Sequence, residues 1–166
     1  MDVYKSLDEA LNHIGNENGS YKEAIIKHDK ENFFLQDSYI ILDKEVKNEL
    51  VQRSVDGETS YLIRNILSEI TTNAYRHGVL KYLKESMLSM AYFSNKGVLL
   101  GTQQNKSFLT NHQISVLEQG RFIPSTNKDP RGRLLSSNQG TKVIVDNADG
   151  LLIDKENKSL YVSKLF

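Results

Sequence analysis

The segment GETSYLIRNILSEITTNAYRHG, residues 57–78, decides the fold that we expect for this chain of 166 residues. At about 100° per residue, its apolar side chains gather on one side of a helix, and that side should face a core. The apolar members are Leu62, Ile63, Ile66, Leu67, Ile70 and Ala74. The opposite side carries Arg64, Asn65, Ser68, Thr71, Thr72, Tyr75 and Arg76. The pattern therefore predicts one amphipathic helix over residues 57–76.

Three polar residues interrupt the apolar side of this helix. Glu69, Asn73 and His77 are spaced i, i+4 and i+8, so they form one polar stripe among the apolar residues. A carboxylate in an apolar setting is costly unless it is paired or bound. The stripe either bonds within itself and to nearby backbone at the edge of the core, or faces a pocket that takes a polar ligand or a metal ion. The spacing alone leaves both interpretations open.

The residues of this stripe belong to a recognisable motif. Residues 69–78, EITTNAYRHG, resemble the E-x-x-x-N-A-x-x-H-(G/A) helix motif of the histidine-kinase-like (GHKL, or Bergerat-fold) ATPase superfamily. That superfamily includes gyrase-type, chaperone, histidine-kinase and anti-sigma-factor kinase domains. The resemblance implies that Glu69 orients or deprotonates the attacking water, that Asn73 is a ligand of Mg²⁺, and that Arg76 or His77 lies near phosphate. Physical chemistry agrees, because Mg²⁺ usually takes few protein oxygens and completes its octahedron with water and phosphate.

Composition limits the remaining choices. With 39% hydrophobic and 25% charged residues, the chain fits one globular domain with a core. It has no run of about 18 apolar residues, and its N-terminus, MDVYKSLDEA, lacks the features of a signal peptide. We therefore expect a cytoplasmic protein without a membrane partner. Zero cysteines exclude disulfides, thiolate catalysis and cysteine-based zinc sites. The balance of 21 basic and 21 acidic residues gives no electrostatic footprint for nucleic acid.

The segments before the central helix give mixed signals. SLDEALNHI, residues 6–14, predicts a short helix, whereas YKEAIIKH, residues 21–28, is compatible with helix or strand. FFLQDSYIIL, residues 33–42, is rich in aromatic and β-branched residues and predicts a strand. Asp43 would then cap an amphipathic helix that continues to about residue 54.

The segments after the central helix predict a hairpin, a helix, a polar loop, a second helix and a closing strand pair. Gly78 is expected to cap the central helix. The hairpin strands are residues 87–93 and 98–102, the first helix is 111–120, the loop is 121–140, the second helix is 141–149, and the closing strands are LLID and SLYVSKLF. The sum is an α/β sandwich of the α+β kind, in which a mostly antiparallel mixed sheet carries helices on one face, as in the Bergerat fold.

The order of these elements over residues 35–166 is similar to the superfamily's nucleotide domain, which leaves residues 1–34 as an N-terminal extension packed on it. The stretch NQGT, which contains Asn138, Gly140 and Thr141, resembles the second glycine box at the start of a helix. Such a box has a physical reason, because N–H groups at a helix N-terminus bind phosphate and glycine permits close approach.

The loop before this box corresponds to the superfamily's lid. It offers Lys128, Arg131 and Arg133 as phosphate contacts, with a solvated basic loop as the alternative for each of them.

The first glycine box departs from the superfamily's pattern. The superfamily places an Asp after the strand pair, where it receives the adenine amino group, whereas residues 100–108 read LGTQQNKSF. Thr102, Gln103 or Asn105 could bond a base instead. The preference for adenine stays open.

Two functions follow from this sequence. The first is an ATP- and Mg²⁺-binding protein, either a phosphoryl-transfer regulator or an ATPase, with Glu69 as catalytic residue and Asn73 as metal ligand. Its expected nucleotide contacts are Asn73, Arg76, His77, Thr102, Lys128, Arg131, Asn138, Gly140 and Thr141. The second is a catalytically inactive pseudo-ATPase that serves as a protein-interaction module, which the degenerate glycine boxes favour. We expect a protein partner in either case, with a homodimer as one alternative.

Overall fold

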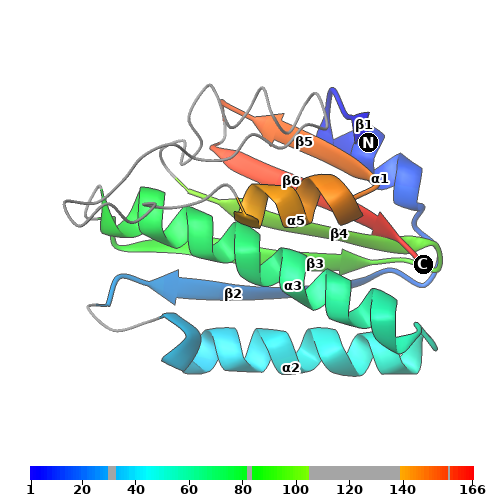
Figure 1. Ribbon diagram of the computed structural model, residues 1–166, viewed down its shortest axis with the longest axis horizontal. Coiled ribbons are helices and arrows are strands. Elements are labelled where there is room, and N and C mark those ends of the chain that lie inside the picture. The colour runs from blue at the N-terminus through cyan, green and yellow to red at the C-terminus, as the bar shows by residue number, and fades with distance from the viewer. Residues whose placement is uncertain (30–32, 82–83, 105–138, 157) are drawn as a thin grey trace.

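One open sheet of six strands organises the structure. The computed structural model describes residues 1–29, 33–81, 84–104, 139–156 and 158–166. Within them the strand order is β1-β5-β6-β4-β3-β2 (Figure 1). The strands are β1 (Asp2–Val3), β2 (Ser20–Lys27), β3 (Ser86–Phe93), β4 (Gly97–Gln103), β5 (Gly150–Asp154) and β6 (Ser159–Leu165). The helices are α1 (Leu7–Ile14), the 3₁₀-helix η1 (Phe33–Leu35), α2 (Asp37–Gln52), α3 (Gly57–Ala74), the π-helix η2 (Tyr75–Leu80) and α5 (Gln139–Asn147).

The pairing of the strands is mixed and mostly antiparallel. β1 pairs with β5 in parallel, whereas the other neighbouring strands pair antiparallel. The α+β class and the mostly antiparallel mixed sheet expected from the sequence are therefore confirmed.

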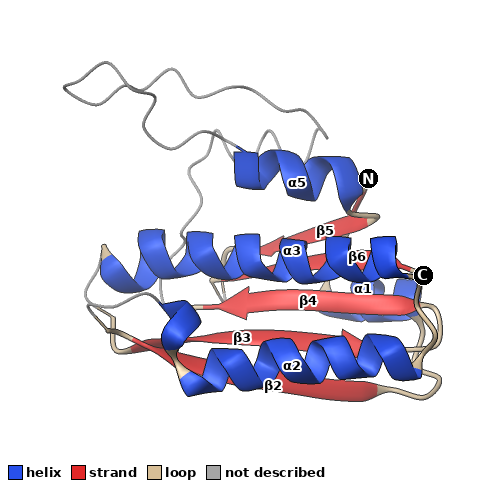
Figure 2. Ribbon diagram, turned by 60° about the horizontal axis from the view of Figure 1, so that its bottom comes forward, coloured by secondary structure: helices blue, strands red, loops and turns tan. Residues whose placement is uncertain are grey.

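The two faces of the sheet are covered differently. α2, α3 and α5 lie on one face, while α1 lies on the opposite face (Figure 2). Alternate residues of β3 serve the two faces, as strand geometry requires. Met87, Ala91 and Phe93 join the larger core beneath α2 and α3, whereas Met90 and Tyr92 pack against the smaller core beneath α1. The expectation of helices on one face holds for three α-helices, and α1 is the exception.

Residues 33–42 form no strand, so that part of the sequence prediction is wrong. η1 occupies the first of these residues, and α2 begins at Asp37. The buried residues of α2 are Tyr39, Leu42, Val46 and Leu50, at helical spacing. The helical period of this longer segment thus outweighs its local β-branched composition.

Asp43 is consequently not a helix cap. It lies inside α2, where Arg64 of α3 donates to both of its carboxylate oxygens, at 3.1 and 2.7 Å. The two side chains are about one-third exposed, so this ion pair aligns the two helices more than it stabilises them.

The segment 21–28, which the sequence left open, is largely the edge strand β2. At the end of this strand, the side chain of Gln36 bonds the backbone of Lys27 as a neighbouring strand would. The N–H of Lys27 donates to Gln36 Oε1 at 2.9 Å, and Gln36 Nε2 donates to the Lys27 carbonyl at 2.7 Å. An edge that is covered in this way is less available for pairing with another chain.

The central helix begins as predicted and ends differently. Asp56 is its N-cap, with Oδ1 accepting a hydrogen bond from the Thr59 N–H at 2.8 Å. After Ala74 the chain continues as η2, and Gly78 is buried within η2 instead of capping the helix.

The elements expected after the central helix are confirmed where the structure describes them. They are the hairpin β3–β4, helix α5, and the closing strands β5 and β6, with α5 beginning at Gln139. The helix expected at residues 111–120 and most of the loop at 121–140 lie outside the described residues.

Candidate functional site

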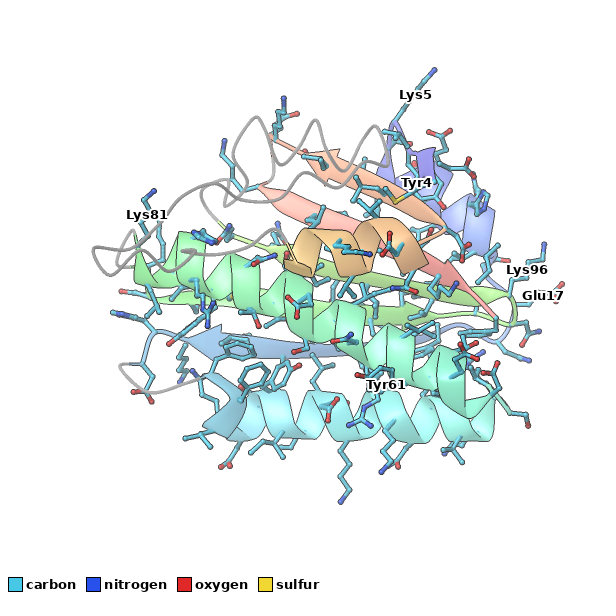
Figure 3. The ribbon with its side chains drawn as sticks, in the orientation of Figure 1. Tyr4, Lys5, Glu17, Tyr61, Lys81 and Lys96 are labelled. Carbon is cyan, nitrogen blue, oxygen red and sulfur yellow. The ribbon has the colours of Figure 1, made fainter. Side chains whose placement is uncertain are left out.

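The C-terminal half of α3, η2 and the end of β4 lie toward one end of the molecule, and α5 begins beside α3, nearer the middle (Figures 1 and 2). α3 packs against both β4 and α5. Lys81, which follows η2, projects at this same end (Figure 3). Residues that are distant in the sequence are therefore brought together here.

The polar stripe lies along the part of α3 and η2 that reaches this end. Glu69, Asn73 and His77 are all half-buried, and Ile66 and Ile70, two apolar residues of the same helix, are fully buried. Within the described residues, no hydrogen bond or ion pair holds any of the three stripe side chains. The stripe is thus an array of polar side chains that are partly withdrawn from water without being paired to one another.

Burial changes the proton affinity of both titratable members of the stripe. It raises the pKa of Glu69, and the nearby Arg76 guanidinium partly offsets this shift. It lowers the pKa of His77, and the positive charges of Lys81 and Arg76 lower it further. Both shifts favour the neutral form, which is the expected effect of a site that water only partly reaches.

A group of buried polar residues lies behind the stripe, between α3 and the sheet. Thr71 of α3 and Ser89 of β3 are fully buried, and their hydroxyls share a hydrogen bond of 2.8 Å. Thr102 of β4 pairs with Ser89 across the sheet and is also fully buried, but no described residue is a hydrogen-bond partner of its Oγ1. Gln104, one residue beyond β4, is 4% exposed, and neither its Oε1 nor its Nε2 has a partner among the residues that the structure describes.

Buried polar atoms are nearly always satisfied in folded proteins, so these exceptions need an explanation. All three unpaired atoms belong to the terminal part of β4 and the residue after it. A polar ligand or a bound water at this end of the molecule would satisfy them.

Gly78 and Gln104 interlock at the same place. A Cβ atom added at Gly78 would lie 1.4 Å from Gln104 Oε1 and 2.4 Å from its Cδ. The carboxamide therefore fills the space that any larger residue at position 78 would need. The contact occurs in a π-helical turn. Such turns are rare in proteins as a whole, and those that occur are often found at functional sites.

The described residues that the sequence predicted for the nucleotide site lie on α3, η2, β4 and α5, and α3 packs against both β4 and α5. Glu69, Asn73, Arg76 and His77 lie on α3 and η2, and Thr102 lies on β4. Gly140 and Thr141 lie in the first turn of α5. Lys128, Arg131, Arg133, Asn105 and Asn138 lie outside the described residues.

Sequence reasoning missed Gln104 and offered Gln103 in its place. The alternation of side chains along a strand could have indicated Gln104, because Leu100, Thr102 and Gln104 occupy alternate positions and should face the same side of the sheet. Gln103 is exposed and lines a hollow on the opposite face.

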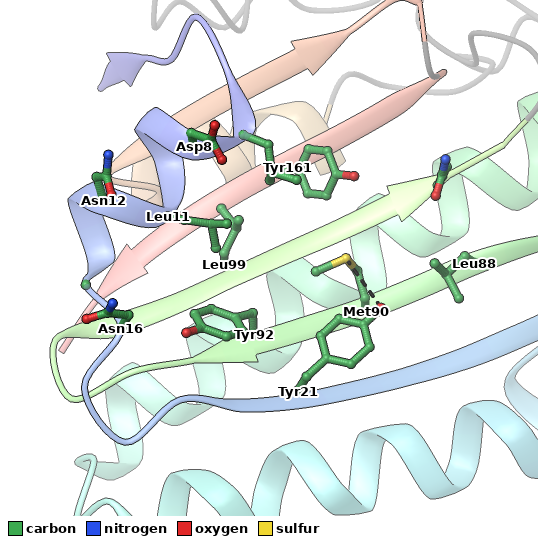
Figure 4. A pocket seen from close by; sticks show the side chains of 13 residues that line it. Asp8, Leu11, Asn12, Asn16, Tyr21, Leu88, Met90, Tyr92, Leu99 and Tyr161 are labelled. Atoms are coloured by element: carbon green, nitrogen blue, oxygen red, sulfur yellow. Dashed lines mark hydrogen bonds between the residues drawn. The ribbon is translucent and has the colours of Figure 1, made fainter.

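That hollow has a volume of about 780 Å³ and lies between α1 and strands β2, β3, β4 and β6 (Figure 4). Its walls are largely aromatic and apolar, with Tyr21, Met90 and Tyr92 on the sheet side. The Tyr21 hydroxyl donates to Glu23 at 2.8 Å, and burial together with this bond raises the pKa of Tyr21 to about 12. Among the described residues predicted to contact the nucleotide, Gln103, which was offered as a base contact, is the one that lines this hollow.

The described residues contain no group of three or more His, Cys, Asp or Glu side chains arranged to hold a metal ion. None of their helices combines the length and apolarity that crossing a membrane requires.

No protein-family model and no curated protein matches this chain.

Proposed function

We propose that this protein binds ATP together with Mg²⁺ where α3 packs against β4 and α5. The observation that carries the proposal is the half-buried polar stripe, which no described residue pairs, beside the unpaired buried atoms of Thr102 and Gln104. The resemblance of residues 69–78 to the histidine-kinase-like ATPase motif supports the same ligand.

The donor atoms of the stripe suit a magnesium nucleotide. Asn73 offers an amide oxygen and Glu69 a carboxylate, and these are the hard donors that Mg²⁺ takes in small number beside phosphate and water. The charge of Arg76 acts on both Glu69 and His77, so Arg76 lies near the stripe, and Arg76 and His77 would lie toward the phosphates. Bound Mg²⁺ would neutralise the charge that develops on the phosphates during transfer.

Glu69 and α5 complete the proposed arrangement. Burial raises the pKa of Glu69, which suits a group that takes a proton from water or a protein hydroxyl. The first turn of α5 contains Gly140 and Thr141, and its backbone N–H groups would receive phosphate oxygens. Because phosphoryl transfer depends mainly on positioning and charge stabilisation, these few groups would suffice for a phosphoryl-transfer regulator or an ATPase.

Titration calorimetry of ATP with and without Mg²⁺ tests this proposal. We expect saturable, Mg²⁺-dependent binding that Asn73→Ala weakens by roughly tenfold or more, since a metal ligand is lost. Asn65→Ala is the matched control, because it removes the same half-buried amide two turns earlier on α3. Absence of heat and of thermal stabilisation at millimolar ATP would contradict the proposal.

A catalytically inactive pseudo-ATPase is the second candidate, and a specific observation favours it. Residues 100–108 contain no Asp and no glycine pair where the resembled family carries its first glycine box. Phosphate release measured for the wild type and Glu69→Gln separates the two candidates. Turnover that Glu69→Gln abolishes while ATP still binds indicates an enzyme, whereas binding without turnover in the wild type indicates the pseudo-ATPase.

A further inference from the structure

The face of the sheet opposite the stripe is covered over only part of its width. α1 shares a core with Leu99 of β4 and Tyr161 of β6, which are buried, whereas Tyr21 of the edge strand β2 is 48% exposed. The hollow of about 780 Å³ lies along the border between these two parts (Figure 4). Sites that bind small molecules have volumes of about 300–1,000 Å³ and apolar or aromatic walls with a few polar groups. The hollow has the size and the lining of such a site.

Three tyrosines and Met90 form the floor of the hollow. A Cβ atom added at Gly101 would lie 2.5 Å from Tyr161 Cδ1 and 3.2 Å from Met90 Cγ, so both side chains close over this glycine. On the other side of Met90, the Tyr21 hydroxyl lies 3.9 Å from its Sδ, and Tyr92 pairs with Tyr21 across the two strands. Glycine at position 101 thus gives the Tyr161 ring room to extend the floor, which we call the tyrosine floor.

The charged groups at the hollow are negative. Among the described residues that line it, Asp8 of α1 is the charged one, and it lies at the end nearer Tyr161 (Figure 4). Glu23 adds a second carboxylate beside the floor, where it accepts a hydrogen bond of 2.8 Å from Tyr21. The faces of tyrosine rings also attract positive charge. A ligand that complements this hollow is therefore flat, aromatic and positively charged.

We propose that the hollow binds a small aromatic cation, with its ring system on the tyrosine floor and its positive nitrogen toward Asp8. Because Asp8 is exposed, solvent screens its attraction, and the rings supply most of the affinity. A second copy of the chain matches this face less well, because a symmetric contact would bring two sets of carboxylates together. The hollow and the proposed nucleotide site lie on opposite faces of the sheet, so this inference does not depend on the proposed function.

Fluorescence titration of N-methylquinolinium with the full chain tests the proposal. This probe is a flat two-ring cation with a permanent charge, and naphthalene-1-carboxylate is a control of similar shape and opposite charge. The chain has no tryptophan, so the probe can be followed without that background. We expect saturable binding of the cation, with a dissociation constant at least about tenfold lower than that of the carboxylate.

Substitutions at Tyr21 and Asp8 locate the binding in the hollow. Tyr21→Leu removes a ring and should raise the dissociation constant of the cation about fivefold or more, whereas Tyr21→Phe keeps the ring and should stay within about twofold of the wild type. Tyr61→Leu is the matched control, because Tyr61 is also exposed but lies on α3. Asp8→Asn should weaken binding about threefold, and Glu9→Gln, at the next position of α1 and outside the lining, should not.

Several outcomes would overturn the proposal. They are absence of saturable binding at millimolar probe, equal or tighter binding of the carboxylate, and a loss of affinity in Tyr61→Leu as large as that in Tyr21→Leu. A dimeric mass in light scattering that Tyr21→Glu converts to a monomeric one would assign this face to a second copy instead. The comparison of cation with carboxylate uses the wild type alone, so it decides the matter even if a variant folds poorly.

Discussion

Glu69 and His77 lie two turns apart on the same polar stripe, yet burial moves their pKa values in opposite directions. The reason is that burial disfavours charge, and the charged form is the deprotonated one for a carboxyl group and the protonated one for an imidazole. The two residues therefore change stability in opposite directions with pH. The raised pKa of Glu69 lowers the free energy of unfolding as pH rises above about 4.5, the ordinary pKa of this group, whereas the lowered pKa of His77 lowers it as pH falls below about 6.5.

His77 gives a prediction for the pH dependence of folding. A histidine with a lowered pKa holds its proton more weakly in the folded chain, so the unfolded chain takes up more protons as pH falls below about 6.5. The free energy of unfolding should therefore decrease as pH falls through this value toward the folded pKa. His77→Gln should flatten that decrease, as measured by urea denaturation between about pH 5 and pH 7.5.

The control for this experiment is His28→Gln, which removes an exposed histidine just after β2. It should leave the pH dependence close to that of the wild type. An unaltered pH profile in His77→Gln would show that the imidazole reaches water freely. That result would contradict the conclusion that His77 is half-buried in the stripe.

At the scale of elements, α3 is fastened to the sheet beneath the stripe by a buried polar contact. The hydroxyls of Thr71 and Ser89 are 2.8 Å apart, and both residues are fully buried. The sequence pattern predicted Thr71 on the solvent side of the helix, because a threonine in a sequence does not reveal whether its hydroxyl is buried or exposed. The hydrogen bond fixes the height of α3 above β3, and with it the position of Glu69 and Asn73.

The Thr71–Ser89 contact predicts a non-additive pair of substitutions. Thr71→Val keeps the shape and leaves the Ser89 hydroxyl buried without this partner, so it should lower the free energy of unfolding by about 1–3 kcal/mol. Adding Ser89→Ala should recover part of this loss, because no unpaired hydroxyl remains. Urea denaturation of both single variants and the double variant measures the coupling. Strict additivity would mean that the hydroxyls do not depend on each other.

Elements with a clear period could be predicted from sequence, and those with conflicting signals could not. α3 shows the helical period over its whole length, and β3 and β4 flank a turn, so their positions are confirmed. α2 was predicted only in part, because Tyr39, Ile40 and Ile41 are β-branched or aromatic in a segment whose burial follows a helical period.

The candidate site shows a similar division. The stripe could be identified because its three residues share one helix and one motif. Gln104 could not be chosen over Gln103, since inward and outward positions of a strand are distinguished by tertiary packing. The approach of Gly78 to Gln104 also joins residues from two separate elements, which no local pattern in the sequence encodes.

At the scale of the whole molecule, the two faces of the sheet have separate cores. α1 fastens the N-terminal residues to the face opposite the candidate site, with Ala10 and Ile14 packed on Leu99 and Leu152. The Ser94 hydroxyl donates to the carbonyl of Ile14, which holds the end of α1 on the β3–β4 turn. The proposed nucleotide site lies on the other face, so stability and ligand binding can be altered independently.

Ile14→Ala tests this independence. Ile14 is fully buried, and its truncation should lower the free energy of unfolding by about 2–4 kcal/mol through lost transfer energy and a residual cavity. Leu7→Ala, on the same helix but 39% exposed, should cost about 1 kcal/mol or less.

A ligand that binds only the folded chain adds a stabilisation that depends on its concentration and dissociation constant. Saturating ATP with Mg²⁺ should therefore raise the unfolding free energy of the wild type and of Ile14→Ala by the same amount. A smaller increment in Ile14→Ala would mean that the α1 core shapes the site through the sheet, and the two faces would then have to be treated as one coupled unit.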